Sequence, residues 1–266
     1  MKASPLRRIG AMVLRYLYLL RSSWPRILEL AYWPTLQMIL WGFITRFFMA
    51  ESTVLGQAAG LLIAAVLLWD VLFRSQLGVS VVFFEELYSR NLGHLFASPL
   101  RPYELICALM IVSLTRTVIG VGAAGLLAIP FYGFNVFALG FPLLVFFANL
   151  MVMGWAVGLL VVSLVLRHGL GAESIAWIAI FAVAPVSGIY YPIATLPGWL
   201  HPLAWALPSS HVFEGMRAVL LEHTFRVDFM AYAVLLNGVY LGVGVLVFLF
   251  TFRLARQRGL LFQSGE

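Results

Sequence analysis

Five or six apolar stretches of membrane length dominate this sequence. Hydrophobic residues make up 62% of its 266 positions, and charged residues make up 11%. A soluble domain of this size needs charge on roughly a quarter to a third of its surface, so lipid must cover most of this exterior. The stretches are about 20 residues or longer, unlike the ~10-residue alternating segments of a membrane barrel. The composition therefore predicts an all-α integral membrane protein.

We expect six transmembrane helices. They run over residues 27–50, 54–84, 103–130, 137–166, 174–195 and 228–252. Residues 5–22 precede them and have the pattern of an amphipathic helix, with apolar side chains at steps of three and four on one face. The arginines of the opposite face are Arg7, Arg8, Arg15 and Arg21. Such a helix is expected to lie in the membrane interface, with its arginines among the lipid headgroups.

The basic residues predict the orientation of the chain. With six spans both termini lie on one side, and that side carries twelve of the basic residues against three on the other. The three are Arg46, Arg217 and Arg226. The positive-inside rule therefore places both termini in the cytoplasm, and we expect a multi-pass protein of the cytoplasmic (inner or plasma) membrane. This distribution also explains the net charge of +6, so we expect lipid contact and no nucleic-acid partner.

The longest polar cytoplasmic connection covers residues 85–101, EELYSRNLGHLFASPLR. It predicts a short helix that Ser98 and Pro99 close. Glu86 and Arg90 are four residues apart, so they could pair on one helix face. A charge run of this kind is often only a solvated loop. Docking of a partner is the interpretation we favour here.

A second unusual connection, residues 196–227, lies on the external side. It contains Pro197, Pro202 and Pro208 and then a helical piece over 209–221. The segment is too apolar for a free loop and too interrupted for a span. We expect a re-entrant or interfacial helical hairpin between spans five and six, because irregular backbone at membrane depth needs protein or a cavity to satisfy it.

Several charged residues fall inside predicted spans. Asp70 and Arg74 are four residues apart in the second span, and Arg116 lies in the third. Charge at membrane depth is costly and is functional by default. For Asp70 and Arg74 a packing pair is the favoured interpretation and contact with a transported molecule is the alternative. Arg116 could also extend toward the interface.

Aromatic and polar residues gather at the external end. Tyr190, Tyr191 and Trp199 are typical of membrane-interface anchors, and stacking on sugar rings is the alternative. His211 and Glu214 follow them. The histidines lack the HExxH spacing of a helical zinc site, and Cys107 is the only cysteine, so we expect no metal site.

Nucleotide chemistry is not expected on this chain. Lys2 is its only lysine, and a Walker A loop needs a lysine directly before Ser or Thr to hold phosphates. If ATP drives this protein, another chain must bind ATP and Mg²⁺. We expect no cofactor and no enzymatic activity here. An intramembrane enzyme built on Ser187 and His211 would lack a third catalytic group.

Three segments together resemble a known family. They are LFASPLRPYEL at 95–105, SGIYYPIATLPGWL at 187–200 and LPSSHVFEGMRAVL at 207–220. In this order and spacing they resemble the permease subunits of type-2 ATP-binding-cassette (ABC) exporters. The resemblance covers nearly the whole chain, which implies one transmembrane domain over 1–266.

The resemblance implies a half-transporter. A second permease copy, identical or related, would pair with this chain around a central pathway, and separate ABC ATPase subunits would power export. Residues 85–101 would be the coupling segment that docks on the ATPase. Its candidate docking residues are Glu85, Glu86, Arg90, His94, Ser98 and Arg101. An ion-coupled secondary transporter or channel that acts without an ATPase is the alternative.

Overall fold

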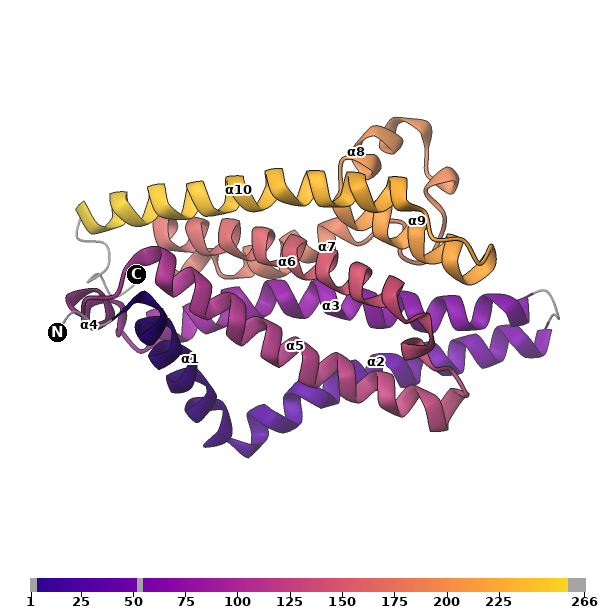
Figure 1. Ribbon diagram of the computed structural model, residues 1–266, viewed down its shortest axis with the longest axis horizontal. Helices are drawn as coiled ribbons and strands as arrows, with labels where there is room; N and C mark the ends of the chain where they lie inside the picture. The colour runs from indigo at the N-terminus through magenta and orange to yellow at the C-terminus, as the bar shows by residue number, and fades with distance from the viewer. Residues whose placement is uncertain (1–3, 52–54, 258–266) are drawn as a thin grey trace.

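In the computed structural model, residues 4–51 and 55–257 are described, and they form helices and turns without a strand. Five of the described helices are long and apolar enough to cross a membrane. They are α2 (Trp24–Glu51), α3 (Leu55–Tyr88), α5 (Pro102–Tyr132), α6 (Phe141–His168) and α10 (Val227–Gln257). Figure 1 shows most of them extended along the long axis of the molecule. The predicted all-α membrane fold is confirmed.

The bundle has two distinct ends (Figure 1). The first, here called the α4 end, carries α4 (Leu92–Ala97), the start of α1 (Pro5–Arg21) and the end of α10. The opposite end, here called the α9 end, carries α9 (Pro208–Leu221) and α8 (His201–Trp205). The short 3₁₀ helices η3 (Ile193–Thr195) and η4 (Gly198–Leu200) lead into α8, and η1 (Val136–Leu139) precedes α6.

The predicted fifth span, residues 174–195, is an α-helix only in its first half. After the short turn η2 (Leu170–Ala172), α7 covers only the 10 residues Ser174–Val183. Ten residues span about 15 Å, half of the ~30 Å hydrocarbon core. Pro185 cannot continue a helix, since it has no N–H and its ring clashes with the preceding turn. Gly188 follows with φ 65°, a left-handed conformation that redirects the chain toward η3.

Small residues let α3 lie close to α5 and α6. Ser113 donates a hydrogen bond to the Ser75 carbonyl across 2.9 Å, next to Gly78. A Cβ atom at Gly154 of α6 would meet Ser75 Oγ and stand 2.8 Å from the Leu72 carbonyl oxygen. Close backbone approach through Gly and Ser, with hydrogen bonds between helices, is the usual way in which membrane helices associate.

An asparagine pair joins α10 to α6. Asn237 is buried and donates to the side-chain oxygen of Asn149 across 2.9 Å and to its carbonyl across 3.0 Å. Gly244, two turns further along α10, lies against the backbone of Ala156. The outward face of α10 exposes large apolar side chains such as Leu246 and Phe250, which suits a face toward lipid.

Helix α1 covers Pro5–Arg21, close to the predicted 5–22. Its buried residues are Met12 and Tyr16, which join the core at the α4 end. The expectation that its arginines lie among headgroups fails for two of them. Arg8 and Arg15 turn toward the protein and bind Glu104 and Glu86, respectively. They do so because a carboxylate that is buried without a cationic partner is strongly destabilised.

The contact of α3 with α6 gives a direct test of the close packing. We expect Gly154→Ala to lower the free energy of unfolding by about 1–3 kcal/mol, because the added methyl group overpacks against backbone that cannot rotate away. Gly122→Ala in α5 is the matched control, since its Cβ would meet nothing within 4 Å. Thermal unfolding in one fixed detergent compares the two. Equal midpoints would contradict the packing argument.

Candidate functional site

A cavity of about 590 Å³ lies among α2, α3, α5 and α7. Its walls combine aromatic rings with charged and amide groups. They are formed by Glu29, Leu30, Trp33, Gln37, Asp70, Phe73, Arg74, Leu77, Gly78, Val81, Arg116, Glu173, Trp177 and Phe181. These residues come from the first half of α2, the middle and second half of α3, the middle of α5, and α7 with the residue before it. The cavity therefore lies in the half of the bundle nearer the α4 end.

Asp70 and Arg74 form the predicted pair on one wall of this cavity. Arg74 Nε donates to Asp70 Oδ2 across 2.8 Å, and their side chains are 11% and 6% exposed. Neutralisation within one helix lowers the cost of both charges at membrane depth. Gly120 of α5 leaves room for this pair, because a Cβ there would stand 3.3 Å from Arg74 Nε and 2.6 Å from the Leu30 carbonyl oxygen.

Aromatic contacts bound the cavity on its side toward the α9 end. Phe73 packs against Trp177 and Phe181, with ring centroids 5.8 Å apart in each case. Trp41, one turn beyond Gln37 in α2, stacks on Tyr190 at 4.6 Å with an angle of 15°. The sequence placed Tyr190 among membrane anchors, whereas the structure uses it to join α2 to the segment after α7.

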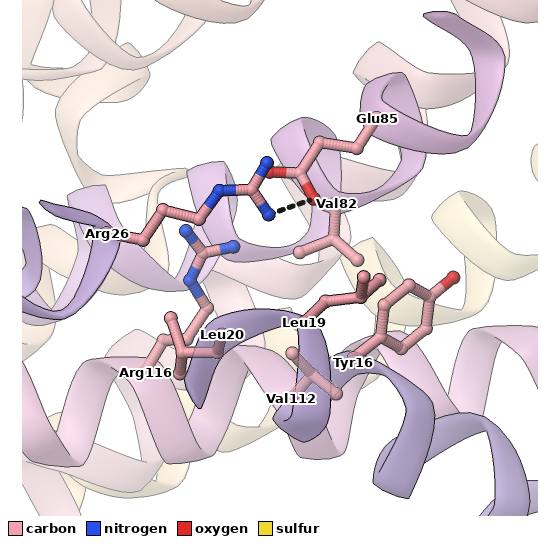
Figure 2. A pocket seen from close by; sticks show the side chains of 8 residues that line it. All are labelled: Tyr16, Leu19, Leu20, Arg26, Val82, Glu85, Val112 and Arg116. Carbon is pink, nitrogen blue, oxygen red and sulfur yellow. Dashed lines mark ion pairs between the residues drawn. The ribbon is translucent and has the colours of Figure 1, made fainter. Parts of the chain in front are cut away.

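A second, much smaller pocket of about 20 Å³ lies where α1 meets α2, α3 and α5. Figure 2 shows its lining, with Arg26 paired to Glu85 and the guanidinium of Arg116 beside Arg26. The Arg26–Glu85 distance is 3.5 Å. Arg116 takes part in the lining of both pockets, so it stands between them.

The predicted coupling segment consists of the end of α3, a turn and α4. Arg90 occupies the turn with φ 54° and is exposed, as are His94 on α4, Ser98 and Arg101. Glu86 is 2% exposed and binds Arg15 and Asn91. The predicted Glu86–Arg90 pair is therefore wrong, because α3 ends at Tyr88 and the left-handed turn breaks the i,i+4 geometry.

Two ion pairs fasten α1 to the helices on either side of α4, and we call them the α1 clamp. Arg15 Nη2 donates to Glu86 Oε2 across 3.1 Å, near the end of α3. Arg8 Nε donates to Glu104 Oε2 across 2.8 Å, at the start of α5. Burial raises the pKa of Tyr16, and the nearby Glu86 raises it further. The clamp was missed at the sequence level because its members are far apart in the chain.

Arg217 organises the irregular backbone at the α9 end. It is 6% exposed and donates to the carbonyl groups of Gly188, Ile189 and Tyr191. It also pairs with Glu214 at 3.1 Å, whose carboxylate accepts the Ile193 N–H at 2.7 Å. From the sequence, Arg217 contributed only to the predicted topology. Its role could have been predicted from its position three residues after a glutamate within an apolar helix.

The other predicted external residues have separate roles. Tyr191 donates its hydroxyl to the Pro185 carbonyl at 2.5 Å, and Trp199 is 78% exposed. His211 bonds through Nε2 to the Trp205 carbonyl at 2.9 Å and stacks on Tyr232. Burial lowers the pKa of His211. Among them, Glu214 pairs with Arg217, and Tyr191 contacts Arg217 through its carbonyl group.

The fold and cavity define a class: a polytopic membrane protein with a polar chamber between its helices, suited to moving a molecule across a bilayer. The sequence matches the ABC-2 type transporter family over residues 16–221. This chain therefore belongs to the ABC-2 type transporter family, as the membrane component of an ABC transporter and not its ATPase.

One relative is "ABC transporter G family member 20" of Dictyostelium discoideum. It is 30% identical over 145 residues, which are 54% of this chain and 20% of the relative. This chain thus matches only about a fifth of the length of that protein.

Arg217 provides a test of how the broken segment is held. We expect Arg217→Met to cost about 3 kcal/mol, because three carbonyl groups and the Glu214 carboxylate lose their donor. Hydrogen exchange over residues 184–193 should rise. Arg226→Met is the matched control, since Arg226 is 45% exposed and pairs only at the surface with Asp228. If hydrogen exchange over residues 184–193 rises no more in Arg217→Met than in Arg226→Met, Arg217 does not hold this segment.

The α1 clamp can be measured by a double-mutant cycle. We expect an interaction energy of about 1–2 kcal/mol between Arg15→Gln and Glu86→Gln. Arg15 is partly exposed, and this exposure weakens its charge-assisted hydrogen bond to Glu86 only in part. Reversible unfolding in mixed micelles gives the four stabilities. The Arg226–Asp228 pair serves as the surface reference. An interaction energy no larger than that of the reference would show that the Arg15–Glu86 pair contributes no more stability than a surface ion pair does.

Proposed function

We propose that this chain is the permease subunit of an ATP-driven exporter, which works as a dimer and is powered by separate ATPase subunits. The observation that carries the proposal is the position of the exposed turn and α4. They lie at one end of the bundle, directly joined to α3, which carries Asp70 and Arg74 of the cavity, and to α5, which carries Arg116. Membership in the ABC-2 type transporter family supports the same conclusion.

The distribution of arginine supports a cytoplasmic α4 end. The described arginines of the predicted cytoplasmic set lie on α1, in the first turn of α2, or at helix ends on the side of α4, such as Arg101 before α5 and Arg167 at the end of α6. Arg46, Arg217 and Arg226 fall at or near the α9 end. By the positive-inside rule the α4 end faces the cytoplasm, and the membrane is the cytoplasmic membrane.

The coupling segment is proposed to dock on the ATPase with its exposed residues. Arg90, His94, Ser98 and Arg101 are accessible. Glu86, which the sequence included among the docking residues, is buried against Arg15, so its proposed part is to connect α3 to α1. ATP and Mg²⁺ would be bound by the ATPase, because these 266 residues contain no Walker A lysine.

Movement of the coupling segment would reach the cavity through rigid helices. Glu86 and Arg74 lie on the same helix, α3, and Glu104 and Arg116 lie on α5. The α1 clamp joins the two helices, so a displacement of α4 would shift both walls together. A ligand-driven switch of this kind requires that ATP bind the two states with different affinity.

The position of the cavity along the bundle supports export. The cavity lies on the side of the α4 end, and Trp41, one turn beyond the cavity residue Gln37 in α2, stacks on Tyr190. A molecule would enter from the cytoplasm or inner leaflet and leave after this stack opens. Trp33, Trp177 and Phe181 remain exposed beside the cavity, and a second permease copy facing them would complete the pathway.

Purification from native membranes tests this proposal. We expect the tagged full-length chain, extracted in mild detergent, to bring down an ABC ATPase in stoichiometric amount with measurable ATP hydrolysis. Mass spectrometry identifies the partner. A clean permease oligomer without an ATPase, reproduced across detergents, would overturn the proposal in favour of an ion-coupled secondary transporter or channel.

The docking surface has its own variant pair. We expect Arg90→Glu to lower recovery of the ATPase several-fold, because it reverses a charge on the exposed turn next to α4. Arg167→Glu is the matched control, an exposed arginine at the same end but at the end of α6. Equal loss in both variants would indicate a general charge effect and would contradict docking through the turn.

A further inference from the structure

Arg116 differs from Arg74, the other arginine that lines the large cavity. Within the described chain it makes no hydrogen bond and no ion pair; its charged neighbours are Glu85, Arg26, Glu29 and Arg74. Arg74 is neutralised by Asp70 at 2.8 Å. A cation inside a membrane span without a protein partner is costly and usually serves a ligand or ion. Arg116 is therefore available to bind an anion.

The surroundings of Arg116 leave positive charge unmatched. Its guanidinium lies beside that of Arg26, and Glu85 is the carboxylate that Arg26 binds, at 3.5 Å (Figure 2). One carboxylate thus lies near two guanidinium groups. Glu29, an exposed residue of α2, lines the large cavity and not the small pocket. The charged groups that line the small pocket, Arg26, Arg116 and Glu85, thus carry one net positive charge.

The large cavity beside Arg116 has aromatic walls as well as polar groups. Trp33, Phe73 and Trp177 supply broad apolar surfaces. A volume of about 590 Å³ falls in the range of sites that enclose one small organic molecule. The small pocket, at about 20 Å³, has room for little more than one water-sized group. Arg116 lines both spaces, so an anion bound to it at the small pocket would lie next to the aromatic walls of the large cavity.

We propose that this site binds an amphiphile with one anionic headgroup. A carboxylate, sulfate or phosphate monoester would accept hydrogen bonds from Arg116 and Arg26. The apolar body would lie along Trp33, Phe73 and Trp177. The role of this amphiphile as transported cargo rests on the proposed function above, whereas its binding to the chain does not require transport.

Binding is measured on the full chain in phosphatidylcholine nanodiscs. The probes are dansyl-labelled dodecanoate and its neutral amide, followed by energy transfer from tryptophan. We expect the anionic probe to bind at least about tenfold more tightly, and Arg116→Gln to remove that difference. Arg253→Gln is the matched control, an exposed arginine near the end of α10. Equal binding of the two probes, or no effect of Arg116→Gln, would overturn the proposal.

Further variants separate charge from loss of folding. Arg116→Lys should keep part of the affinity, since ammonium retains the charge but not the planar fork. Glu85→Gln should strengthen binding of the anionic probe a few-fold, because the competing carboxylate is removed. Trp177→Ala should weaken both probes alike. Weaker anionic binding in Glu85→Gln with an unchanged unfolding midpoint would contradict the assignment.

Competition identifies the source of the headgroup. We expect dodecyl phosphate, or phosphatidylglycerol built into the nanodisc, to displace the anionic probe. Displacement by inorganic phosphate at the same concentration would indicate a site for a free anion and overturn the amphiphile. These outcomes are independent of ATPase recovery. A chain that brings down its ATPase but binds no anionic probe keeps the proposed function and loses only this inference.

Discussion

The ion pairs of the α1 clamp are the interactions on which the rest of the architecture at the α4 end depends. Glu86 and Glu104 are 2% and 0% exposed, and a buried carboxylate without a partner would cost several kcal/mol. Arg15 and Arg8 supply the partners from α1. Because Glu86 is near the end of α3 and Glu104 near the start of α5, the same pairs fix the two helices that frame the exposed turn and α4.

Within the bundle, close packing and open space follow from side-chain size. Where Gly154 and Gly78 meet Ser75 and Ser113, backbones approach closely and hydrogen bonds cross between helices. On the other side of α3, aromatic and charged side chains hold α2 and α7 apart and leave the cavity. At the α9 end the backbone is irregular, and Arg217 satisfies its carbonyl groups as water would at a surface.

Agreement between sequence and structure is best for features that lie within one helix. The Asp70–Arg74 pair was predicted because residues four apart share a helix face, and it is present. The same rule gave the Glu86–Arg90 pair, which fails because α3 ends between the two residues and Arg90 has φ 54°. The true partner of Glu86 lies 71 residues earlier. The predicted fifth span, 174–195, is α-helical only up to Val183, and Pro185 and Gly188 interrupt it.

The sequence by itself determined the membrane class, the positions of the long helices, the charge asymmetry and the resemblance to ABC permeases. Each of these depends on composition, on helix period or on motifs that are local in the chain. The tertiary structure alone decided the cavity, the α1 clamp, the Trp41–Tyr190 stack and the unpartnered position of Arg116. These features join helices that are remote in sequence. Apolar stretches show that helices meet in lipid, but the choice of contacting faces depends on how glycines, aromatic rings and buried charges of different helices fit together.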